Sequence, residues 1–520
     1  MNWIKNKNYL LLAFLSIVFF FIYNFLNFNN NFIFNSPDEN ANFVFVNNFL
    51  ENNNLFLQPI KDFGKQSFFV HPRSTFVNEN KQVLPISFWG IMLVYGLLGK
   101  IFSVYAVKFF TSVFVIMAMW AFYFIVEKLF EKRIALLSAF LFVTNYSVWY
   151  YSSRSMFHNM PFVSLVIIGV WFLFVRPVKS RLWLNDFLGM FIFLLGVLFR
   201  TNEVVWLAIA YLIFLLVFKK NIAWSRFFSW CLVGLFFLLF YFGFSKYLYN
   251  GFFSNYISSG SLPIRHWYFF VLPLGFDFWI TAKSVWFYFF KINLLYSLSA
   301  LFSSFLFVYL FTKTKINKMQ FVYFLVLLFV SSFLFFYYGS NRDALFSLNT
   351  ITVAYVRYWL PVFVGFVPII AFALIFIFDK IKNIHLKYGF IFFYLAVHLF
   401  FSFYLVYYGP DGIFAIKNNF TYIEKVQDWT VDNTSPNAII ITDYEDKYFW
   451  PKRSVMVDFF NEDISKTVYE LLEKNEEIYY FVNISKDNNQ KLLDHLSKSN
   501  FNISYFKDFE FHSLYKINLK

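Results

Sequence analysis

Two adjacent carboxylates stand near the N-terminus, in the stretch 35–40 (Asn-Ser-Pro-Asp-Glu-Asn), just after the first apolar segment of the chain. Acidic residues are scarce, with 30 Asp and Glu against 44 Lys and Arg. A carboxylate at a membrane interface can act as a general base that takes a proton from an attacking hydroxyl group. We therefore predict Asp38 and Glu39 to be catalytic. The alternative interpretation is that both merely stabilise the positive end of a helix that follows Pro37.

Basic side chains recur in the segments between later apolar stretches. An Arg guanidinium binds phosphate oxygens through two parallel hydrogen bonds, and a phosphate leaving group needs its charge neutralised as the bond to it breaks. Acidic residues combined with such basic groups are the minimum for group transfer from a phosphate-bearing lipid. The side chains that we predict to bind the phosphate of that lipid are His71, Arg73, Arg154, His158 and Arg357.

Each of these residues also has a structural interpretation. The segment His71-Pro-Arg73 fits an ordinary polar turn. Arg154 and His158 would lie on one helical face, four residues apart, if a helix continues through them. Arg357, in Arg357-Tyr-Trp-Leu-Pro361, fits an aromatic anchor at the membrane interface.

Two further polar residues, Arg200 and Glu203, are three residues apart, and we expect them to pair with each other at a helix end. The chain has no Gly-rich phosphate loop, no His-Glu-x-x-His and no Cys-x-x-Cys. These absences argue against an ATPase and against a zinc protease.

The composition indicates a membrane protein built from many helices. Of the 520 residues, 59% are hydrophobic and only 14% are charged, which is more apolar surface than a soluble domain can bury. The net charge of +14 fits the enrichment of Lys and Arg in cytoplasmic loops, so we predict no nucleic-acid partner. A single cysteine, Cys231, excludes an intramolecular disulfide framework.

The length of the apolar segments and the position of the basic clusters predict about eleven transmembrane helices. Residues 28–84 then form a first outer loop, and Ile86–Phe102 is a helix at the outer interface or a further span. The basic clusters Lys128–Arg133, Arg176–Arg181, Lys219–Arg226, Lys313–Lys318 and Lys380–Lys387 all fall on the cytoplasmic side. The predicted spans are Tyr9–Phe28, Val104–Glu127, Ile134–Tyr151, Met160–Val175, Asp186–Phe199, Val204–Phe218, Phe227–Tyr247, Ser284–Phe311, Met319–Tyr338, Val353–Phe378 and Tyr388–Tyr408.

The composition changes after Gly409-Pro410, where charged residues become frequent. We predict strands at 438–442, 454–458, 478–482 and within 509–519, and helices at 464–474 and 490–499. The fold class is therefore an all-α polytopic membrane domain (residues 1–408) followed by a small extracytoplasmic α/β domain (residues 409–520). The protein is expected in the plasma membrane, with its active site and C-terminal domain outside.

This arrangement resembles the GT-C superfamily of glycosyltransferases, and more narrowly its protein O-mannosyltransferase and aminoarabinose transferase branch. Three features carry the resemblance: the Asp38-Glu39 pair after one span, the His71-Pro-Arg73 segment followed by an apolar stretch ending at Lys100, and Arg357-Tyr-Trp-Leu-Pro361. The family's His-Pro-Pro-Leu segment is His-Pro-Arg-Ser here. We do not find the Trp-Trp-Asp signature of oligosaccharyltransferases, so transfer of a whole oligosaccharide is less expected.

The resemblance implies an inverting transfer of a hexose or pentose from a polyprenyl-phosphate donor to a lipid, glycan or protein acceptor. In such an enzyme Asp38 would be the base or would orient the acceptor, and Glu39 would support it. Arg73, Arg154 and Arg357 would hold the lipid phosphate. Some relatives use a divalent metal at the acidic loop. Nothing in the sequence requires a cofactor, and both a metal-dependent and a metal-independent reaction fit the sequence.

Two other functions compete with this one. A transporter or flippase of a lipid-linked intermediate should bury charge near the bilayer midplane, whereas most ionisable residues here fall at span ends. A non-catalytic scaffold would use its outer domain to bind partners and would be indifferent to loss of the Asp38 carboxylate.

Overall fold

The computed structural model describes residues 7–28, 30–178, 181–218, 224–251, 272, 275–339, 350–483, 492 and 500–520. The chain packs as two compact units. The helical unit comprises Met1–Asn29, Lys108–Tyr241 and Ser261–Ala415, as far as these ranges are described. The loop–sheet unit comprises Asn30–Val107, Phe242–Gly260 and Ile416–Lys520. This division differs from the boundary at residue 409 suggested by composition, because the first loop packs with the C-terminal segment.

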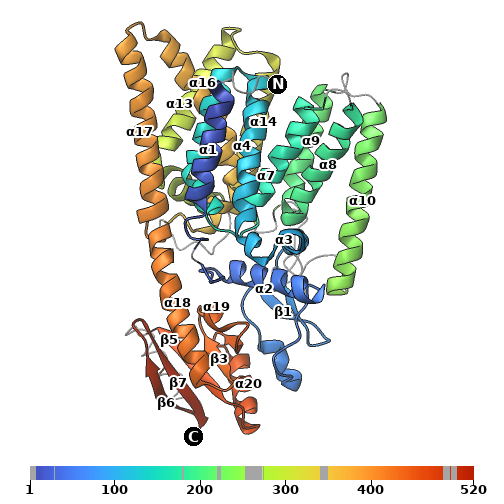
Figure 1. Cartoon of the computed structure of the whole chain (residues 1–520), viewed down its shortest axis with the longest axis vertical. Helices are drawn as coiled ribbons and strands as arrows, with labels where there is room; N and C mark the ends of the chain where they lie inside the picture. The colour runs from blue at the N-terminus through green and yellow to red at the C-terminus, as the bar shows by residue number, and fades with distance from the viewer. Residues whose placement is uncertain are drawn as a thin grey trace. The chain divides into compact units, whose positions relative to one another are not determined.

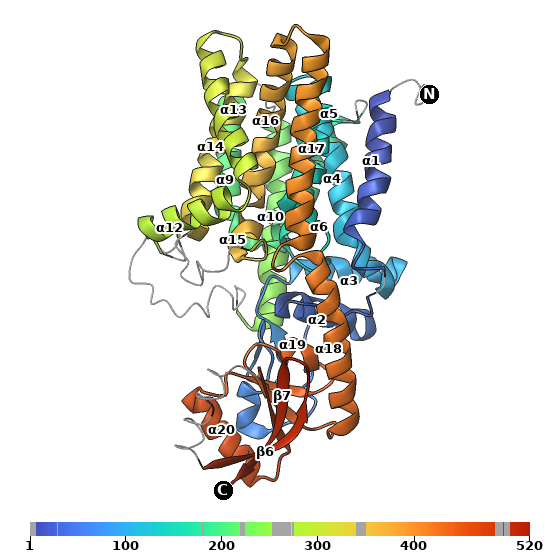
Figure 2. The ribbon, with the colours of Figure 1, turned by 90° about the vertical axis from the view of Figure 1, so that its left-hand side faces the viewer.

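The helical unit consists of apolar helices. Figures 1 and 2 show its long helices running in the same general direction, with α14 beside α16 and α4 beside α7. Its helices are α1 (Lys7–Tyr23), α4 (Phe110–Leu129), α5 (Lys132–Thr144), α6 (Tyr146–Ser152), α7 (Asn159–Val170), α8 (Leu182–Phe199), α9 (Val204–Phe218), α10 (Trp224–Tyr249, ending in the other unit), α12 (Phe278–Val285), α13 (Leu294–Thr312), α14 (Lys318–Gly339), α15 (Ala354–Tyr358), α16 (Leu360–Lys380) and α17 (Ile384–Tyr408).

Every segment predicted to span the membrane contains a helix. Within the described residues, seven helices are long and apolar enough to cross a bilayer, or eight if the pair α5 and α6, bent by 54°, counts as one. Shorter apolar helices, Lys7–Tyr23, Asn159–Val175 and Thr201–Ile213, coincide with three further predicted spans. The multi-pass helical architecture is confirmed.

Three predicted spans are interrupted. The segment 134–151 breaks at Asn145, whose side chain accepts a hydrogen bond from the backbone N–H of Ser147 and so begins α6. The segment 284–311 breaks before α13, where the Asn293 side chain accepts a hydrogen bond from the backbone N–H of Tyr296 and so begins a new helix. The segment 353–378 breaks at Trp359, because Pro361 lies in the first turn of α16, a position that suits proline. The helices that follow the last two breaks, Leu294–Thr312 and Leu360–Lys380, are each long and apolar enough to cross a bilayer, so these two spans begin later than predicted.

Close helix packing depends on glycine between α7 and α8. A Cβ atom on Gly169 would lie 2.8 Å from the Gly189 carbonyl oxygen and 2.8 Å from the backbone nitrogen of Phe193. Any larger residue at 169 would therefore push the two helices apart.

The loop–sheet unit combines the first loop with the C-terminal region. Its elements are α2 (Pro37–Asn52), the 3-10 helix η2 (Gly64–Phe69), β1 (Thr75–Val77), β2 (Val83–Pro85), α3 (Gly90–Phe102), the 3-10 helix η3 (Val104–Phe109, ending in the helical unit), α18 (Ile413–Asn433), β3 (Ile439–Thr442), α19 (Asp446–Phe449), β4 (Ser454–Val457), α20 (Glu462–Glu473), β5 (Ile478–Asn483), β6 (Phe501–Asp508) and β7 (His512–Leu519). Strands β1 and β2 form an antiparallel hairpin.

Five strands form a mixed sheet in the order β4-β3-β5-β7-β6. β3 pairs in parallel with β4 and β5, and β7 pairs antiparallel with β5 and β6. Both views show α18 running along this sheet (Figures 1 and 2). On that face Trp429 of α18 packs against Phe506, and Phe481 of β5 against Phe449 of α19. The α/β character of the C-terminal region is confirmed.

The opposite face of the sheet carries a core to which the first loop contributes. Phe63 and Val70 are buried with Ile441, Tyr480 and Val468 in one hydrophobic cluster. Two polar contacts add to this attachment: Lys61 pairs with Glu476 at 2.7 Å, and Gln66 donates to Glu470 at 2.6 Å. The first loop is thus a structural part of the C-terminal domain.

The local predictions for the C-terminal region hold for most strands. β3, β4, β5, β7 and α20 fall where the apolar pattern predicted them. Helices α18 and α19 and strand β6 were not predicted, and the helix predicted at 490–499 lies outside the described residues apart from Leu492. Polar residues between the apolar ones made the helical pattern of α18 hard to recognise. Its apolar face includes the buried side chains of Ile416, Ile423 and Val426.

Candidate functional site

The acidic pair lies in the first turn of α2. Ser36 is the residue that caps the helix and Pro37 starts it, a position that suits proline. Asp38 is half-buried, whereas Glu39 is only 2% exposed. An Asp38 carboxylate oxygen accepts a hydrogen bond from the Ser74 hydroxyl at 2.6 Å. Both carboxylates thus lie at the positive end of the helix, as the structural interpretation expected, and a second segment of the first loop also holds that of Asp38.

Helix α2 is anchored within the loop–sheet unit by amide side chains and by close packing. Asn40 donates a hydrogen bond to the Trp450 carbonyl oxygen at 3.1 Å, and Ser87 donates to Asn42 at 3.3 Å. A Cβ atom on Gly96 of α3 would lie 2.5 Å from the ring of Phe49. These contacts hold the helix that carries Asp38 in one position.

Arg73 makes an ion pair with Asp446, which is fully buried at the start of α19. The Arg73 backbone N–H donates to one carboxylate oxygen at 2.8 Å, and the guanidinium donates to the other at 2.8 and 2.6 Å. The guanidinium also donates to the Tyr444 carbonyl oxygen and lies over the Tyr444 ring. The side chain predicted to bind lipid phosphate thus fastens the loop that carries Ser74.

His71 lies at the other end of the same turn. Its Nδ1 atom is 3.0 Å from the Pro72 carbonyl oxygen and 3.4 Å from the Thr75 hydroxyl. Burial lowers the pKa of His71, and the Pro72 carbonyl and Asp446 oppose that shift only in part. The neutral imidazole is therefore favoured near neutral pH.

Arg154 and His158 lie between α6 and α7, where the backbone is not helical. The two residues therefore do not share a helical face, and that interpretation of their spacing was wrong. Both are buried, at 4% and 6% exposure. Arg154 donates a hydrogen bond to the Tyr150 hydroxyl at 2.8 Å. His158 occupies the cap position directly before helix α7.

Three arginines and two aromatic rings form an arginine–aromatic row within the helical unit, consisting of Arg154, Phe157, Arg357, Tyr358 and Arg200. The Arg154 and Arg357 guanidiniums lie 5.0 and 5.1 Å from the Phe157 ring centre. The Arg357 and Arg200 guanidiniums lie 5.2 and 4.9 Å from the Tyr358 ring centre. Cation–π contacts of this kind stabilise guanidinium groups in a desolvated place.

Arg200 is the member of this row that the sequence analysis assigned to a structural pair and not to the donor phosphate. Its Nε donates to Glu203 at 2.8 Å and its Nη2 to the Tyr338 hydroxyl at 2.8 Å. The expected pairing of Arg200 with Glu203 is confirmed, and both are buried. The sequence did contain a signal for Arg200. An arginine at a helix end, outside the basic clusters, indicates a functional or paired position. Its contact with Tyr358, next to Arg357 in the chain, appears only in the fold.

The structure thus brings the predicted residues together in two groups. Asp38 meets the turn that carries His71 and Arg73, through Ser74, in the loop–sheet unit. Arg154 and Arg357 meet at Phe157 in the helical unit. In the part of the chain that is described, no three His, Cys, Asp or Glu side chains form a group that could hold a metal ion.

The fold was compared with known proteins. The model of the family described as dolichyl-phosphate-mannose-protein mannosyltransferase matches residues 81–244. ArnT from Cupriavidus metallidurans bound to undecaprenyl phosphate superposes with a TM-score of 0.57 at 8% identity, over 98% of this chain and 97% of that one. The protein has the GT-C fold.

Archaeal oligosaccharyltransferases share this architecture. AglB from Archaeoglobus fulgidus, in complex with an inhibitory peptide and a dolichol-phosphate, gives a TM-score of 0.56 at 10% identity over 97% of this chain and 73% of that one. An oligosaccharyltransferase from the same organism, tethered to an acceptor peptide with an NVT sequon, gives 0.53 at 13% identity over 98% and 74%. No curated protein matches the sequence. At these identities the likeness concerns the GT-C fold, and the predicted resemblance is confirmed at that level.

Proposed function

We propose that the protein is a membrane glycosyltransferase that moves a sugar from a polyprenyl-phosphate donor to an acceptor hydroxyl on the outer face of the plasma membrane. The observation that carries the proposal is the position of Asp38, in the first turn of α2 and hydrogen-bonded to Ser74, within a chain of GT-C fold. Two structural neighbours, ArnT and AglB, hold undecaprenyl phosphate and dolichol-phosphate respectively. These are the donor carriers we expect here.

In the proposed reaction the acceptor oxygen attacks the anomeric carbon as the bond from that carbon to the phosphate oxygen breaks. Asp38 takes the proton of the attacking hydroxyl, and the bonding electrons leave with the polyprenyl phosphate. Attack opposite to the leaving group inverts the anomeric configuration. General-base assistance of this kind contributes about 10²–10⁴ in rate. Glu39 is buried in the same helical turn and supports Asp38 by helping to fix the position of α2.

The leaving phosphate needs positive charge. The arginine–aromatic row supplies the guanidiniums of buried Arg154 and half-buried Arg357, and partial removal from water strengthens their attraction for an anion. We assign Arg154 and Arg357 to the donor phosphate, with His158 as a neighbouring polar contact. Arg73, engaged by Asp446, and His71 act on the reaction through the turn that holds Ser74 against Asp38. No step in this scheme uses a metal.

The test uses full-length protein in lipid nanodiscs with a panel of undecaprenyl-phosphate hexoses and pentoses as donors and a cell-envelope extract as the source of acceptor hydroxyl groups. Release of undecaprenyl phosphate is measured by mass spectrometry, and donor binding is measured separately. In Asp38→Asn the amide oxygen still accepts the Ser74 hydrogen bond, while the base is lost. We expect turnover to fall about 10²–10⁴-fold with donor binding retained. Glu51→Gln, at the exposed end of the same helix, should be silent.

Equal turnover in Asp38→Asn and in the unaltered protein would contradict the proposal. So would movement of intact lipid-linked sugar across the membrane without cleavage, which is what a transporter or flippase predicts. The acceptor and the sugar follow from the glycans lost in a deletion strain.

A further inference from the structure

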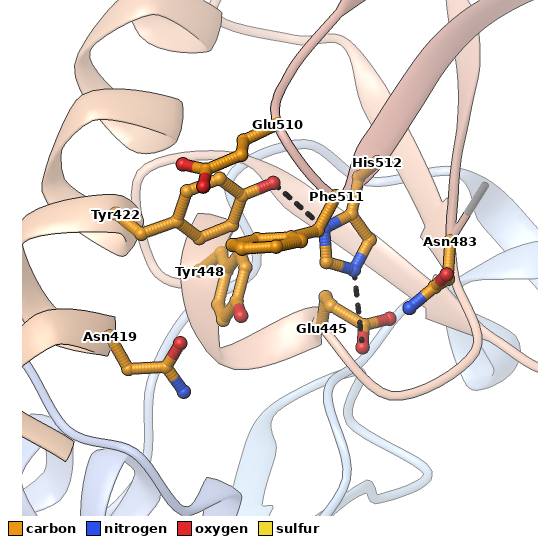
Figure 3. A pocket seen from close by; sticks show the side chains of 8 residues that line it. All are labelled: Asn419, Tyr422, Glu445, Tyr448, Asn483, Glu510, Phe511 and His512. Carbon is orange, nitrogen blue, oxygen red and sulfur yellow. Dashed lines mark hydrogen bonds and ion pairs between the residues drawn. The ribbon is translucent and has the colours of Figure 1, made fainter. Parts of the chain in front are cut away.

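A cavity of about 520 Å³ lies within the loop–sheet unit and takes no part in the scheme above. Figure 3 shows side chains from α18, from the segment that leads into α19, and from the start of β7 converging on it. The volume falls in the range of about 300–1,000 Å³ that is usual for ligand sites. Its walls are mainly polar, with aromatic rings among them.

His512 is the central polar group of this cavity. It is only 6% exposed, its ring stacks on Phe481 at 4.6 Å, and its Nδ1 lies 2.8 Å from the Tyr422 hydroxyl. Its Nε2 lies 3.7 Å from a Glu445 oxygen, which is too far for a hydrogen bond. Among the described residues Nε2 has no hydrogen-bond partner. A buried polar atom in this state is commonly satisfied by a ligand or by water.

The other walls restrict the class of ligand. Two carboxylates, Glu445 and Glu510, line the cavity and disfavour an anion. Glu445 accepts a hydrogen bond from the Tyr444 backbone N–H at 3.0 Å and is attracted by Lys447, which weakens its attraction for an external cation. Asn419 adds an amide, and Phe511 presents a ring that is 52% exposed. Hydrogen-bond donors, acceptors and an accessible ring together suit a neutral polyhydroxylated molecule with one apolar face.

We propose that this cavity binds a carbohydrate, with the apolar face of a pyranose on Phe511 and a sugar hydroxyl bridging His512 Nε2 and the Glu445 carboxylate. This inference rests on the proposed glycosyltransferase function. The sugar bound in the cavity is then part of a glycan acceptor.

The walls of the cavity are tied to the segments that hold Asp38. The Asn419 side chain donates to Asn35 at 2.9 Å, three residues before Asp38. Glu445 directly precedes Asp446, which holds Arg73 and with it the turn of Ser74. An acceptor glycan in this cavity would therefore contact the same framework that positions the carboxylate.

Binding is tested on the full-length protein in nanodiscs by saturation-transfer NMR with mannobiose, cellobiose and chitobiose, without any lipid donor. We expect saturable binding of at least one disaccharide. His512→Gln and Phe511→Ala should each weaken it by at least about tenfold. Tyr505→Ala, which removes a ring 62% exposed on β6, is the matched control and should bind as the unaltered protein does.

The inference is overturned if no disaccharide binds saturably, or if His512→Gln and Phe511→Ala bind like the control. Saturable binding of choline in place of the sugars would also overturn it, since it would make the cavity a site for organic cations. The outcome is separable from that of the donor assay. Loss of sugar binding with intact donor turnover removes only this inference, and sugar binding without any donor turnover removes only the proposed function.

Discussion

The Arg73–Asp446 ion pair is the contact that we expect to hold the first loop to the C-terminal domain. Asp446 is fully buried and accepts three hydrogen bonds from Arg73, at 2.8, 2.8 and 2.6 Å. In Asp446→Asn one oxygen remains as an acceptor, while the new NH₂ group meets an N–H donor. The substitution therefore removes the charge and at least one hydrogen bond without changing the size of the side chain.

The magnitude follows from the burial of the two partners. Hydrogen bonds to charged groups contribute about 1.5–3 kcal/mol each, and loss of one partner of a buried pair costs about 3–5 kcal/mol. The Arg73 side chain is 28% exposed, so water compensates for part of the loss. We expect local opening of the turn to become easier by about 2–3 kcal/mol, which corresponds to about 30–150-fold in the opening equilibrium.

The measurement is amide hydrogen exchange of the full-length protein, read on peptides that contain the Arg73 N–H. That N–H donates to Asp446, so its exchange rate reports the opening directly. Asp428→Asn is the matched control, because its side chain is 63% exposed and pairs with Lys452 at 3.8 Å; we expect less than about a fivefold change anywhere. Turnover should fall as well, because Ser74 follows Arg73.

An exchange rate at Arg73 that rises less than about threefold in folded Asp446→Asn would refute the reasoning. The loop would then be held by the apolar contacts of Phe63 and Val70 and by the Lys61–Glu476 and Gln66–Glu470 contacts. Arg73→Lys should give an intermediate effect, since an ammonium group lacks the planar fork of donors.

Three further outcomes are expected. The folded-state pKa of His71 is lowered, so the unfolded chain binds more protons and stability should fall as the pH drops below about 6.5; His71→Gln should flatten that slope in thermal unfolding at pH 7.5 and 5. Gly169→Ala should cost about 1–3 kcal/mol in unfolding experiments by overpacking α7 against α8, whereas Gly234→Ala, whose Cβ would meet nothing within 4 Å, should be neutral. In a Cys231→Ser background, Asn502→Cys on exposed β6 should react in intact cells with a membrane-impermeant maleimide; labelling only after lysis would contradict the outer location.

Much of the architecture follows from local patterns. Apolar length and basic clusters located the helices, because a segment that crosses a bilayer must hide its own backbone polar groups. Pro37 and the acidic residues after it located the start of α2. The helix breaks at Asn145, Asn293 and Trp359 were not predicted. A single capping residue or proline inside a long apolar segment gives a weaker sequence signal than the hydropathy of the whole segment.

The candidate site was predictable only in part. Asp38 stood out by type and position, and Arg154 and Arg357 by being basic outside the cytoplasmic clusters. Their meeting at Phe157 could not be predicted, since the two arginines belong to segments far apart in the chain. Arg200 was assigned its pairing with Glu203 but not its place beside Tyr358.

The sequence by itself determined that this is a multi-pass helical membrane protein with an acidic pair after its first helix and an α/β region at its C-terminus. Those properties are local, because hydropathy, charge and capping act within a few turns of a helix. Only the tertiary structure decided that the first loop belongs to the C-terminal domain and that Arg73 is bound to Asp446, 373 residues away. Ion pairs and core contacts of that range depend on how distant surfaces fit, and no local pattern records that fit.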